Sequence, residues 1–396
     1  MSAPMVHVHA APLRTAVARM FAAAGCDAEE ANVIAANLVD ANRFGHDSHG
    51  VVLTRVYVDN VAAGLAAPGR TLQIVTDAGT LIGADGGKGF GQSIGVQAMR
   101  VAIERAKATG TCILGLSNTH HVARIGHWAE QCAAAGMASI HFVNVLSTPL
   151  VAPWGGSDAR LSTNPFCVGV PYDPHPLILD FATSIVAMGK ARVALDAGKR
   201  MATGLLLDAQ GQPTDDPAVM FADPIGALLP FGQHKGFALA VMCELLGGAL
   251  SGGRVQDHHP RPSPMINNML SIVFAPDRLC SREDFARQVA SLSAWLRASP
   301  PTTPGGRVQL PGEPERATAR ARRERHPAGG AYTRDARRHG GAAWRGGGGR
   351  AAPGGHRPAL TPRAAAARAR WRPTPIPSTR PAARRRSAPP RRGATS

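Results

Sequence analysis

The sequence lacks the features that mark several common classes of protein. Its six cysteines form no CxxC pair and show no ligand-like spacing, so they predict neither a disulfide framework nor a cysteine metal site. No basic region followed by an apolar stretch of about 7–15 residues is present near Met1, so no signal peptide is predicted. The longest apolar run, Gly236 to Leu250, contains Glu244 and is shorter than the ~20 residues of a membrane span. These absences predict a soluble, cytoplasmic protein with reduced thiols.

Positive charge is concentrated at one end of the chain. The whole sequence has 44 Lys and Arg against 27 Asp and Glu. Residues 317–396 contain 20 of the arginines, no lysine and two acids, Glu324 and Asp335. The rest of the chain keeps 24 basic and 25 acidic residues. The body is therefore close to neutral, and the charge that would attract a polyanion belongs to the tail.

Residues 326–396 consist mainly of Arg, Pro, Gly and Ala, without apolar periodicity. Such a composition cannot bury a core, so disorder is predicted for this tail. Codons made only of G and C encode these same four residue types, and we hypothesise that a frameshift near residue 320 replaced the natural terminus. The alternative, a nucleic-acid-binding arm, is disfavoured because the tail offers only Tyr332, Trp344 and Trp371 for base stacking.

The body alternates helices and strands in an irregular order. Apolar periodicity predicts two helices within residues 11–45 and further helices at 92–109, 120–136, 235–250 and 282–298. Segments rich in β-branched or aromatic residues predict strands at 111–116, 140–146, 166–170, 177–181 and 270–274. This order favours a mixed α/β fold over a regular βαβ repeat.

The glycine-rich segment from Gly83 to Gly91 is not a dinucleotide fingerprint. That motif needs GxGxxG directly after a strand and an acid about 20 residues further on. The glycine spacing differs here, and the acid near that distance, Glu104, falls inside the next predicted helix. We predict a turn that leads into a helix, so a nicotinamide function must be argued from other residues.

Two polar clusters could carry chemistry. Ser48 and His49 lie just after a predicted helix, and Asp180 ends a predicted strand. A carboxylate at a strand end can orient a histidine and stabilise its charged form, which makes a proton donor near neutral pH. A hydrolase triad is the weaker interpretation, because Ser48 and His49 are neighbours and the chain has no GxSxG elbow. Purely structural roles, at a helix end for His49 and in a turn for Asp180, stay open.

Other histidines suggest anion binding rather than metal binding. His120, His121 and His127 have no carboxylate partner at a recognised spacing, so no metal site is predicted. The loop before the predicted 120s helix, with Arg124, could bind phosphate through free N–H groups. His234-Lys235-Gly236 opens another predicted helix in the same way. A solvated helix end is the alternative for each.

Seven short motifs follow one another along the body. They are Gly45-His-Asp-Ser-His-Gly50, Thr119-His-His-Val-Ala-Arg-Ile-Gly126, Val151-Ala-Pro-Trp-Gly155, Ser162-Thr-Asn-Pro-Phe166, Leu179-Asp-Phe-Ala-Thr-Ser184, His234-Lys-Gly236 and Leu310-Pro-Gly-Glu313. In this order they resemble the type 2 malate/L-lactate dehydrogenase family over about residues 10–320.

The resemblance implies a fold, a cofactor and an assembly. The expected fold is α/β but not Rossmann, with a largely antiparallel central sheet, flanking helices and a disordered C-terminal tail. The expected cofactor is NADH or NADPH, the partner a small 2-oxo acid, and the assembly a homodimer. We expect a helical substrate and dimer region at 1–75, a cofactor-binding α/β domain at 76–255, and a return segment at 256–325. The family's C-terminal helix is expected to be missing after Leu310–Glu313.

The resemblance also implies roles for individual residues. His49 is expected to donate a proton to the substrate oxygen or imine nitrogen, with Ser48 and Asp180 in support. The expected cofactor contacts are His121, Ala123, Arg124, Leu179, Phe181, Ala182, His234, Lys235, Asn267, Gly312 and Glu313. The expected substrate contacts are Thr163, Asn164 and Arg55.

One departure bears on the substrate. Many members of the family carry Arg where this chain has Leu53, and Arg55 is nearby but out of register. A more apolar pocket follows, which favours larger or aromatic 2-oxo acids over malate. Three alternatives stay open: malate or L-lactate oxidation, reduction of a cyclic imine such as piperideine- or pyrroline-2-carboxylate, and an inactive product whose basic tail binds nucleic acid.

Overall fold

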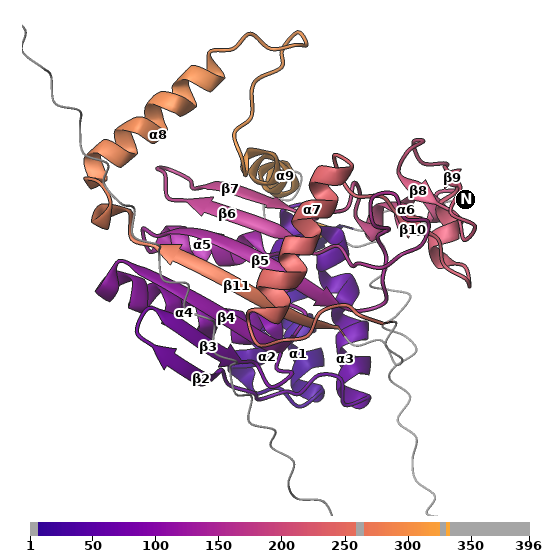
Figure 1. Cartoon of the computed structure of the whole chain (residues 1–396), viewed down its shortest axis with the longest axis horizontal. Coiled ribbons are helices and arrows are strands. Elements are labelled where there is room, and N and C mark those ends of the chain that lie inside the picture. Colours follow the sequence, from indigo (N-terminus) through magenta and orange to yellow (C-terminus); the bar gives the residue numbers. More distant parts are fainter. Residues whose placement is uncertain (1–6, 259–264, 325–329, 333–396) are drawn as a thin grey trace, which may run out of the picture. The chain divides into compact units, whose positions relative to one another are not determined.

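A central β-sheet organises the protein (Figure 1). The computed structural model describes residues 7–258, 265–324 and 330–332, and within them seven strands form this sheet in the order β2-β3-β4-β11-β5-β6-β7. The strands are β2 (Gln73–Ala78), β3 (Leu81–Asp85), β4 (Thr111–His120), β5 (Ala138–Leu146), β6 (Phe166–Val170), β7 (Leu177–Phe181) and β11 (Ile266–Phe274). Neighbouring strands are antiparallel except β3 and β4. The expected non-Rossmann α/β fold with a largely antiparallel sheet is confirmed.

Nine α-helices within the described residues surround or extend this sheet. They are α1 (Ala10–Ala23), α2 (Ala28–Arg43), α3 (Thr54–Ala62), α4 (Gly91–Thr109), α5 (Gly126–Ala134), α6 (Met188–Asp196), α7 (His234–Met242), α8 (Arg282–Arg297) and α9 (Glu313–Glu324). Short 3₁₀ turns are η1 (Asp47–His49), η2 (Val51–Leu53), η3 (Pro217–Phe221) and η5 (Pro276–Arg278), and η4 (Cys243–Ala249) is a π-helix. Of these, no helix is both long and apolar enough to cross a membrane.

Three smaller strands and two terminal ones complete the secondary structure. The strands β8 (Leu206–Leu207), β9 (Pro213–Thr214) and β10 (Ala227–Leu228) form a small antiparallel sheet. The backbone of β1 (His7–His9) pairs antiparallel with β12 (Gly330–Tyr332). Disorder was expected over residues 326–396, with an origin by frameshift near residue 320. Of this tail, the described residues include only Gly330–Tyr332, which form β12, and the rest lies outside them.

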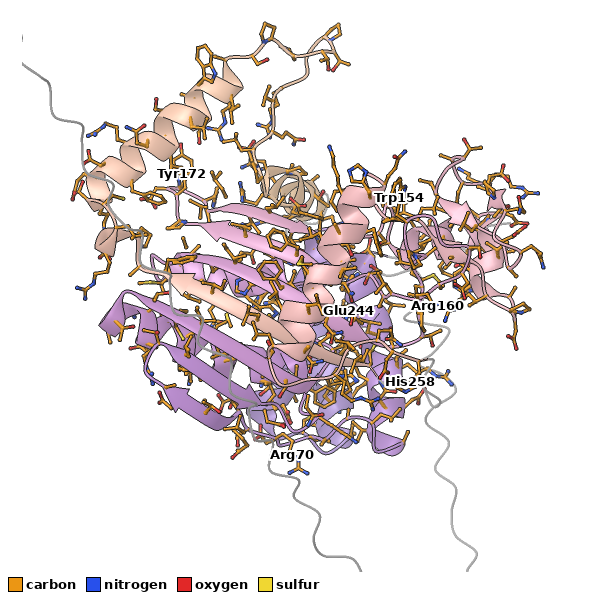
Figure 2. The ribbon with its side chains drawn as sticks, viewed as in Figure 1. Arg70, Trp154, Arg160, Tyr172, Glu244 and His258 are labelled. Carbon is orange, nitrogen blue, oxygen red and sulfur yellow. The ribbon has the colours of Figure 1, made fainter. Side chains whose placement is uncertain are left out.

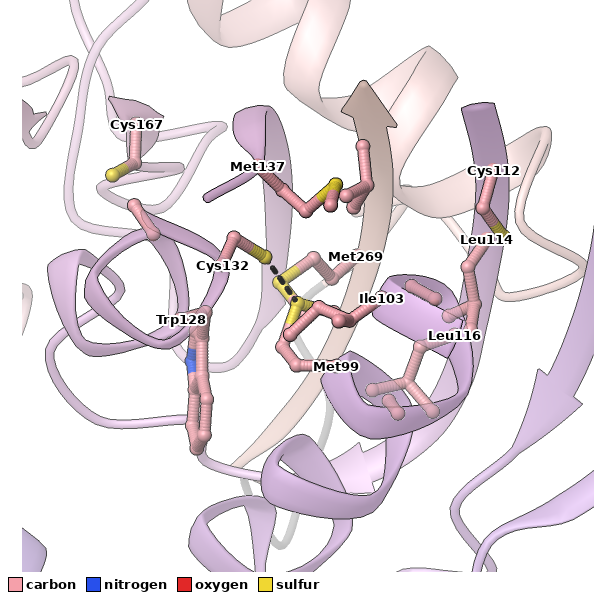
Figure 3. Packing of buried hydrophobic residues seen from close by; sticks show 14 of the residues in the cluster. Met99, Ile103, Cys112, Leu114, Leu116, Trp128, Cys132, Met137, Cys167 and Met269 are labelled. Carbon is pink, nitrogen blue, oxygen red and sulfur yellow. Dashed lines mark hydrogen bonds between the residues drawn. The ribbon is translucent and has the colours of Figure 1, made fainter. Parts of the chain in front are cut away.

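The two faces of the central sheet are covered by different helices. On one face, α4 packs over β4 and β11, and α5 packs over β5, β6 and β7. Met99, Trp128 and Met269 lie together in the buried cluster on this face (Figure 3). The thiol of Cys132 donates to the sulfur of Met99 over 3.7 Å inside this cluster. On the other face lie α7 and η4 (Figure 1), and there is no room for a side chain between Gly247 of η4 and the backbone of β5.

The helix predicted for residues 120–136 begins later than expected. The strand β4 continues to His120, because that residue still pairs with Ile266 of β11. Ala123 then takes a left-handed backbone with φ of 57°, which an α-helix cannot contain. The helix α5 therefore starts only at Gly126.

A helix follows Leu310–Glu313, where the family's C-terminal helix was expected to be missing. The helix α9 starts at Glu313 and continues to Glu324. Its first turn holds Glu313 and Glu315, and its last turn holds Arg322 and Arg323, so the charges complement the helix dipole at both ends.

Candidate active site

Ser48 and His49 lie in η1, which starts at Asp47, shortly after α2 ends at Arg43. Ser48 Oγ is 3.0 Å from His49 Nδ1. Asn42 fixes this turn, because its side chain donates to Asp47 Oδ1 over 2.6 Å and accepts from the backbone N–H of Val51 over 2.9 Å. A side chain at the next residue, Gly50, would overlap the amide of Asn42. The turn is therefore held in one shape from inside the protein.

Asp180 lies at the end of β7, as predicted, beside Arg124. Its Oδ2 accepts the backbone N–H of Gly126 over 2.8 Å. A Cβ at Gly126 would lie 2.6 Å from Nη1 of Arg124 and 2.7 Å from Oδ2 of Asp180, so these two charged groups meet above a glycine. The side chain of Arg124 is only 5% exposed and pairs with Glu130 over 2.5 Å. Arg124 is thus used inside the protein, which weakens its interpretation as an open phosphate ligand.

The electrostatics of the site keep His49 neutral near pH 7. Burial, followed by the neighbouring His46, lowers the pKa of His49 to about 4, and Asp180 opposes this only in part. Burial also raises the pKa of Asp180, although Arg124 and the N–H of Gly126 act in the other direction. The expected effect of Asp180 on His49 has the right sign, but desolvation outweighs it.

His121 packs against His49, although the two residues are 72 positions apart in the sequence. The two rings stack with centroids 5.6 Å apart at an interplanar angle of 28°. Nδ1 of His121 lies 2.6 Å from the hydroxyl of Tyr57 in α3, and Gln92 of α4 donates to the same hydroxyl over 3.2 Å. Sequence reasoning missed Tyr57 and Gln92, because an isolated Tyr or Gln inside a helix carries no signal of a distant partner.

The loop between His121 and α5 is held by Asn267 of β11. The backbone N–H of Val122 donates to Oδ1 of Asn267 over 2.8 Å. The other amide atom of Asn267 donates to the carbonyl of Asn144 over 3.2 Å. Asn267 therefore shapes the loop that contains Ala123, and its own amide is already used at both ends.

The remaining residues expected near the cofactor lie at the end of β7, at the start of α7 and at the start of α9. Leu179, Phe181 and Ala182 lie at the end of β7 around Asp180, and Leu179 is exposed. His234 and Lys235 are exposed at the start of α7, where the His234 ring lies 5.5 Å from that of Trp154.

Gly312 and Glu313 form the start of α9. Gly312 has φ of 85°, which suits glycine at such a turn. The carboxylate of Glu313 accepts the N–H of Leu310 over 2.9 Å and pairs with Arg297 over 2.6 Å. These contacts give Glu313 a structural role at the helix start. They leave its expected cofactor contact as a proposal.

Each of the three residues expected at the substrate has contacts within the protein. Asn164 is buried, where it donates to Glu244 over 2.6 Å and accepts from the N–H of Val145 over 3.1 Å. The carbonyl of Thr163 accepts both the N–H and the hydroxyl of Thr183 at 2.9 Å. Arg55 is on the open side of α3, 59% exposed, with Asp59 at 3.5 Å.

No group of three or more His, Cys, Asp or Glu side chains could hold a metal ion in the part of the chain that the structure describes.

Comparison with known proteins agrees with this fold. The chain matches the family model described as malate/L-lactate dehydrogenase over residues 8–326. It is 43% identical over 316 residues to hydroxycarboxylate dehydrogenase B of Escherichia coli K12, which covers 79% of this chain and 87% of that protein. It is 33% identical over 323 residues to the Delta(1)-pyrroline-2-carboxylate/Delta(1)-piperideine-2-carboxylate reductase of Pseudomonas putida, covering 79% and 92%.

A solved structure shows the same likeness in three dimensions. The malate dehydrogenase of Pyrococcus horikoshii superposes with a TM-score of 0.73 at 28% identity, covering 83% of this chain and 92% of that one. The resemblance found in the sequence motifs is therefore confirmed, and so is the expected activity class. The chain belongs to the malate/L-lactate dehydrogenase family and is an oxidoreductase that acts on 2-hydroxy and 2-oxo acids with a nicotinamide cofactor.

Proposed function

We propose that His49 exchanges the proton at C2–O when this protein interconverts a 2-oxo acid and a 2-hydroxy acid. The observation that carries the proposal is the contact of Ser48 Oγ with His49 Nδ1 at 3.0 Å, inside a turn that Asn42 fixes. A hydrogen bond to one ring nitrogen orients the other nitrogen of a histidine, as proton transfer requires.

The charge state of His49 suits each direction of the reaction differently. With a pKa of about 4, the neutral ring can accept the hydroxyl proton of a 2-hydroxy acid near pH 7. In the reductive direction, the carboxylate of a bound 2-oxo acid adds to the negative charge of Asp180, and both favour the protonated ring. Asp180 thus supports His49 as a proton donor once an anionic substrate is present.

The nicotinamide cofactor supplies or accepts the hydride at C2 of the substrate. The residues on this chain fit such a group. The side chain of Lys235 is exposed at the start of α7, so its ammonium group can meet a phosphate. The proposed contacts also include His121, Ala123, Leu179, Phe181, Ala182, His234, Gly312 and Glu313, with Arg124 and Asn267 acting through the shape of the loop. NADH and NADPH both remain candidates, to be separated by direct comparison of the two cofactors.

We propose larger or aromatic 2-oxo acids as the preferred substrates. Leu53 is uncharged and half-buried against the apolar cluster of the N-terminal helices. The neighbouring Val52 and Val56 are exposed apolar residues on the same stretch as His49. Arg55 has a carboxylate partner in Asp59, which reduces its value as an anchor for a second substrate carboxylate.

The test compares His49→Ala with His175→Ala, a change at an exposed histidine of the loop between β6 and β7. Consumption of NADH and of NADPH is measured with phenylpyruvate, pyruvate and oxaloacetate. We expect His49→Ala to lose turnover by about 10²- to 10⁴-fold, the contribution typical of general acid–base catalysis, with cofactor binding retained. Normal turnover of His49→Ala alongside normal turnover of the control would overturn the proposal.

A second candidate reaction is the reduction of a cyclic imine. The same His49 would then protonate the imine nitrogen in place of the carbonyl oxygen. The similarity to the Pseudomonas putida reductase favours including piperideine-2-carboxylate in the same assay. A larger kcat/KM for the imine than for every 2-oxo acid would select this reaction.

We also propose a cytoplasmic homodimer. Five of the six cysteines are buried free thiols, which fits a reducing compartment. The helix α8 exposes Leu292, Leu296 and Trp295, the last 78% exposed, and such a patch is typical of an interface. Sedimentation of the wild type should give a dimer that Trp295→Glu dissociates, while Ala290→Glu, at an exposed position on the opposite face of the same helix, should not. A monomeric wild type would contradict the assembly.

A further inference from the structure

Behind His49, hydrogen-bonding side chains lead from the site into the protein core. The His121 ring stacks on that of His49, and its Nδ1 lies 2.6 Å from the hydroxyl of Tyr57. Gln92 donates to this hydroxyl over 3.2 Å. Tyr57 is 0% exposed, so water does not compete for its hydroxyl.

The distances from the Tyr57 hydroxyl to His121 and to Gln92 indicate which of the two accepts its proton. Burial raises the pKa of Tyr57 above its usual range, so the phenol keeps its single proton. A separation of 2.6 Å to His121 suits an O–H donor and is short for an N–H donor, whereas 3.2 Å to Gln92 suits an amide N–H donor. The hydroxyl of Tyr57 therefore accepts from Gln92 and donates to Nδ1 of His121.

The reverse arrangement would leave worse unpaired groups. If Tyr57 donated to Gln92, the amide of Gln92 would have to turn its oxygen toward the hydroxyl. Its NH₂ group would then be buried without an acceptor among the described residues. In the observed arrangement, the atom of Gln92 without a partner is the carbonyl Oε1. A buried carbonyl oxygen without a partner is more common in proteins than a buried N–H without one.

We infer that Tyr57 is a positioning residue that holds His121 as the Nε2–H tautomer, so that His121 offers a hydrogen-bond donor to a ligand oxygen. A neutral imidazole carries one N–H, and an accepting Nδ1 leaves that proton on Nε2. The side chain of His121 is partly exposed, and no partner for Nε2 is found within the described ranges. This inference rests on the proposed function, since it takes His49 as the neighbour of the reacting atoms.

The surroundings of His121 keep its ring neutral. Burial, together with His49 and His120, lowers the pKa of His121 well below its usual value. His49 stacks on the ring from η1, and Tyr57 contacts it from α3. His120, at the end of β4, packs against the other side chain in this group, Tyr57. A second positive charge stacked on His49 would oppose protonation of His49 itself. The nitrogen of His121 that would take an extra proton is Nδ1, and the hydrogen bond from Tyr57 occupies it. Tyr57 therefore also keeps His121 neutral, which leaves His49 free to be protonated.

Two oxygen sources share the chemistry that an N–H donor recognises. One is the carboxylate of the 2-oxo acid, and the other is the carboxamide carbonyl of the nicotinamide. The kinetic constants of a variant distinguish them, because loss of a substrate contact raises the KM for the 2-oxo acid and loss of a cofactor contact raises the KM for NADH or NADPH.

The direct test is spectroscopic and does not depend on turnover. Long-range ¹H–¹⁵N correlation spectra of the full chain with ¹⁵N-labelled histidine report the tautomer of each ring. The variant His121→Asn identifies the signals of His121 among the 15 histidines. We expect Nε2–H at neutral pH. Protonation on Nδ1 in the wild type would overturn the inference even in an active enzyme.

The variant Tyr57→Phe removes the donor, with Tyr172→Phe in the loop between β6 and β7 as the matched control (Figure 2). We expect Tyr57→Phe to mix the two tautomers of His121 and to raise one of the two KM values by about tenfold. An unchanged tautomer and unchanged KM values in a folded variant would overturn the role of Tyr57. If Tyr57→Phe does not fold, the wild-type spectrum still decides. Failure of the proposed function would appear separately, as normal turnover in His49→Ala.

Discussion

Arg322 of α9 pairs with Asp47 through both terminal nitrogens, with each N–O distance at 2.9 Å. Asp47 lies in η1, two residues before His49, and Arg322 also contacts the carbonyl of Asn42 at the end of α2. The helix α9 is therefore bonded to η1, the turn that contains the proposed proton donor His49.

We predict that Arg322→Lys lowers kcat/KM by about tenfold, which corresponds to about 1.4 kcal/mol of lost positioning in the transition state. Lysine keeps the charge but cannot form two parallel hydrogen bonds to one carboxylate. Arg320→Lys, at an exposed position of the same helix, serves as the control in steady-state assays. Equal kcat/KM for both variants would show that α9 does not position the site.

The low pKa of His49 predicts opposite pH profiles for the two directions. Above a pKa of about 4, the protonated fraction of His49 falls tenfold for each pH unit. At saturating cofactor, kcat/KM for a 2-oxo acid should fall from pH 5 to pH 8, while kcat/KM for the 2-hydroxy acid should be flat. Measurement of both profiles checks this, and a reductive profile independent of pH would contradict it.

Gly189 of α6 lies close to Ser48, although it is not part of the Gly45–Gly50 motif. A Cβ there would lie 2.7 Å from Cβ of Ser48, so Gly189→Ala must displace Ser48. We predict a loss of kcat of about 10- to 100-fold, as for a misplaced catalytic group, with little change in Tm because alanine suits a helix. The adjacent Lys190→Ala, at an exposed position, should keep wild-type activity. Thermal melts and kinetics of both variants together distinguish misplacement from unfolding.

Leu53→Arg should shift substrate preference toward dicarboxylates. A guanidinium that reaches a second carboxylate adds about 1.5–3 kcal/mol, or roughly ten- to a hundredfold, to the ratio of oxaloacetate to phenylpyruvate turnover. The control is Val75→Arg, which places the same charge on an exposed side chain of β2. An identical substrate ranking in wild type and Leu53→Arg would count against an apolar pocket at this position.

Buried histidines predict a loss of stability in mild acid. Burial lowers the pKa of His141 to about 3 and that of His120 to about 4, both below the value of an exposed histidine. The unfolded chain therefore binds more protons between those values and about pH 6.5, so the free energy of unfolding falls as pH decreases through that window. Each such histidine contributes about 2 kcal/mol of loss between pH 6.5 and 5.

Urea unfolding at those two pH values measures the loss. His141 is hydrogen-bonded to Ser139 and Ser271, so His141→Gln can keep polar partners without titrating. We expect this variant to show a smaller pH dependence than the wild type. The same dependence in both would exclude His141 as a source.

The strands at 166–170 and 177–181 were predicted with the bounds that the structure shows, because short β-branched runs between turns carry a local signal. Ser48, His49 and Asp180 could be selected in the same way, by residue type at the end of an element. The late start of α5 could not be predicted, since it depends on the pairing of His120 with Ile266 in a distant strand. Likewise, the contact of Tyr57 with His121 spans 64 residues, and only the packing of α3 against β4 brings the two side chains together.

The place of β11 in the sheet has a consequence for synthesis of the protein. This strand, residues 266–274, lies between β4 and β5, which are completed more than a hundred residues earlier. During synthesis, the strands β2-β3-β4 and β5-β6-β7 emerge before β11, which joins them into one sheet. Until then, each group has an unpaired edge strand that can pair with another nascent chain. Chains interrupted before residue 274 should therefore aggregate and depend on chaperones, whereas chains that extend past it can close the sheet.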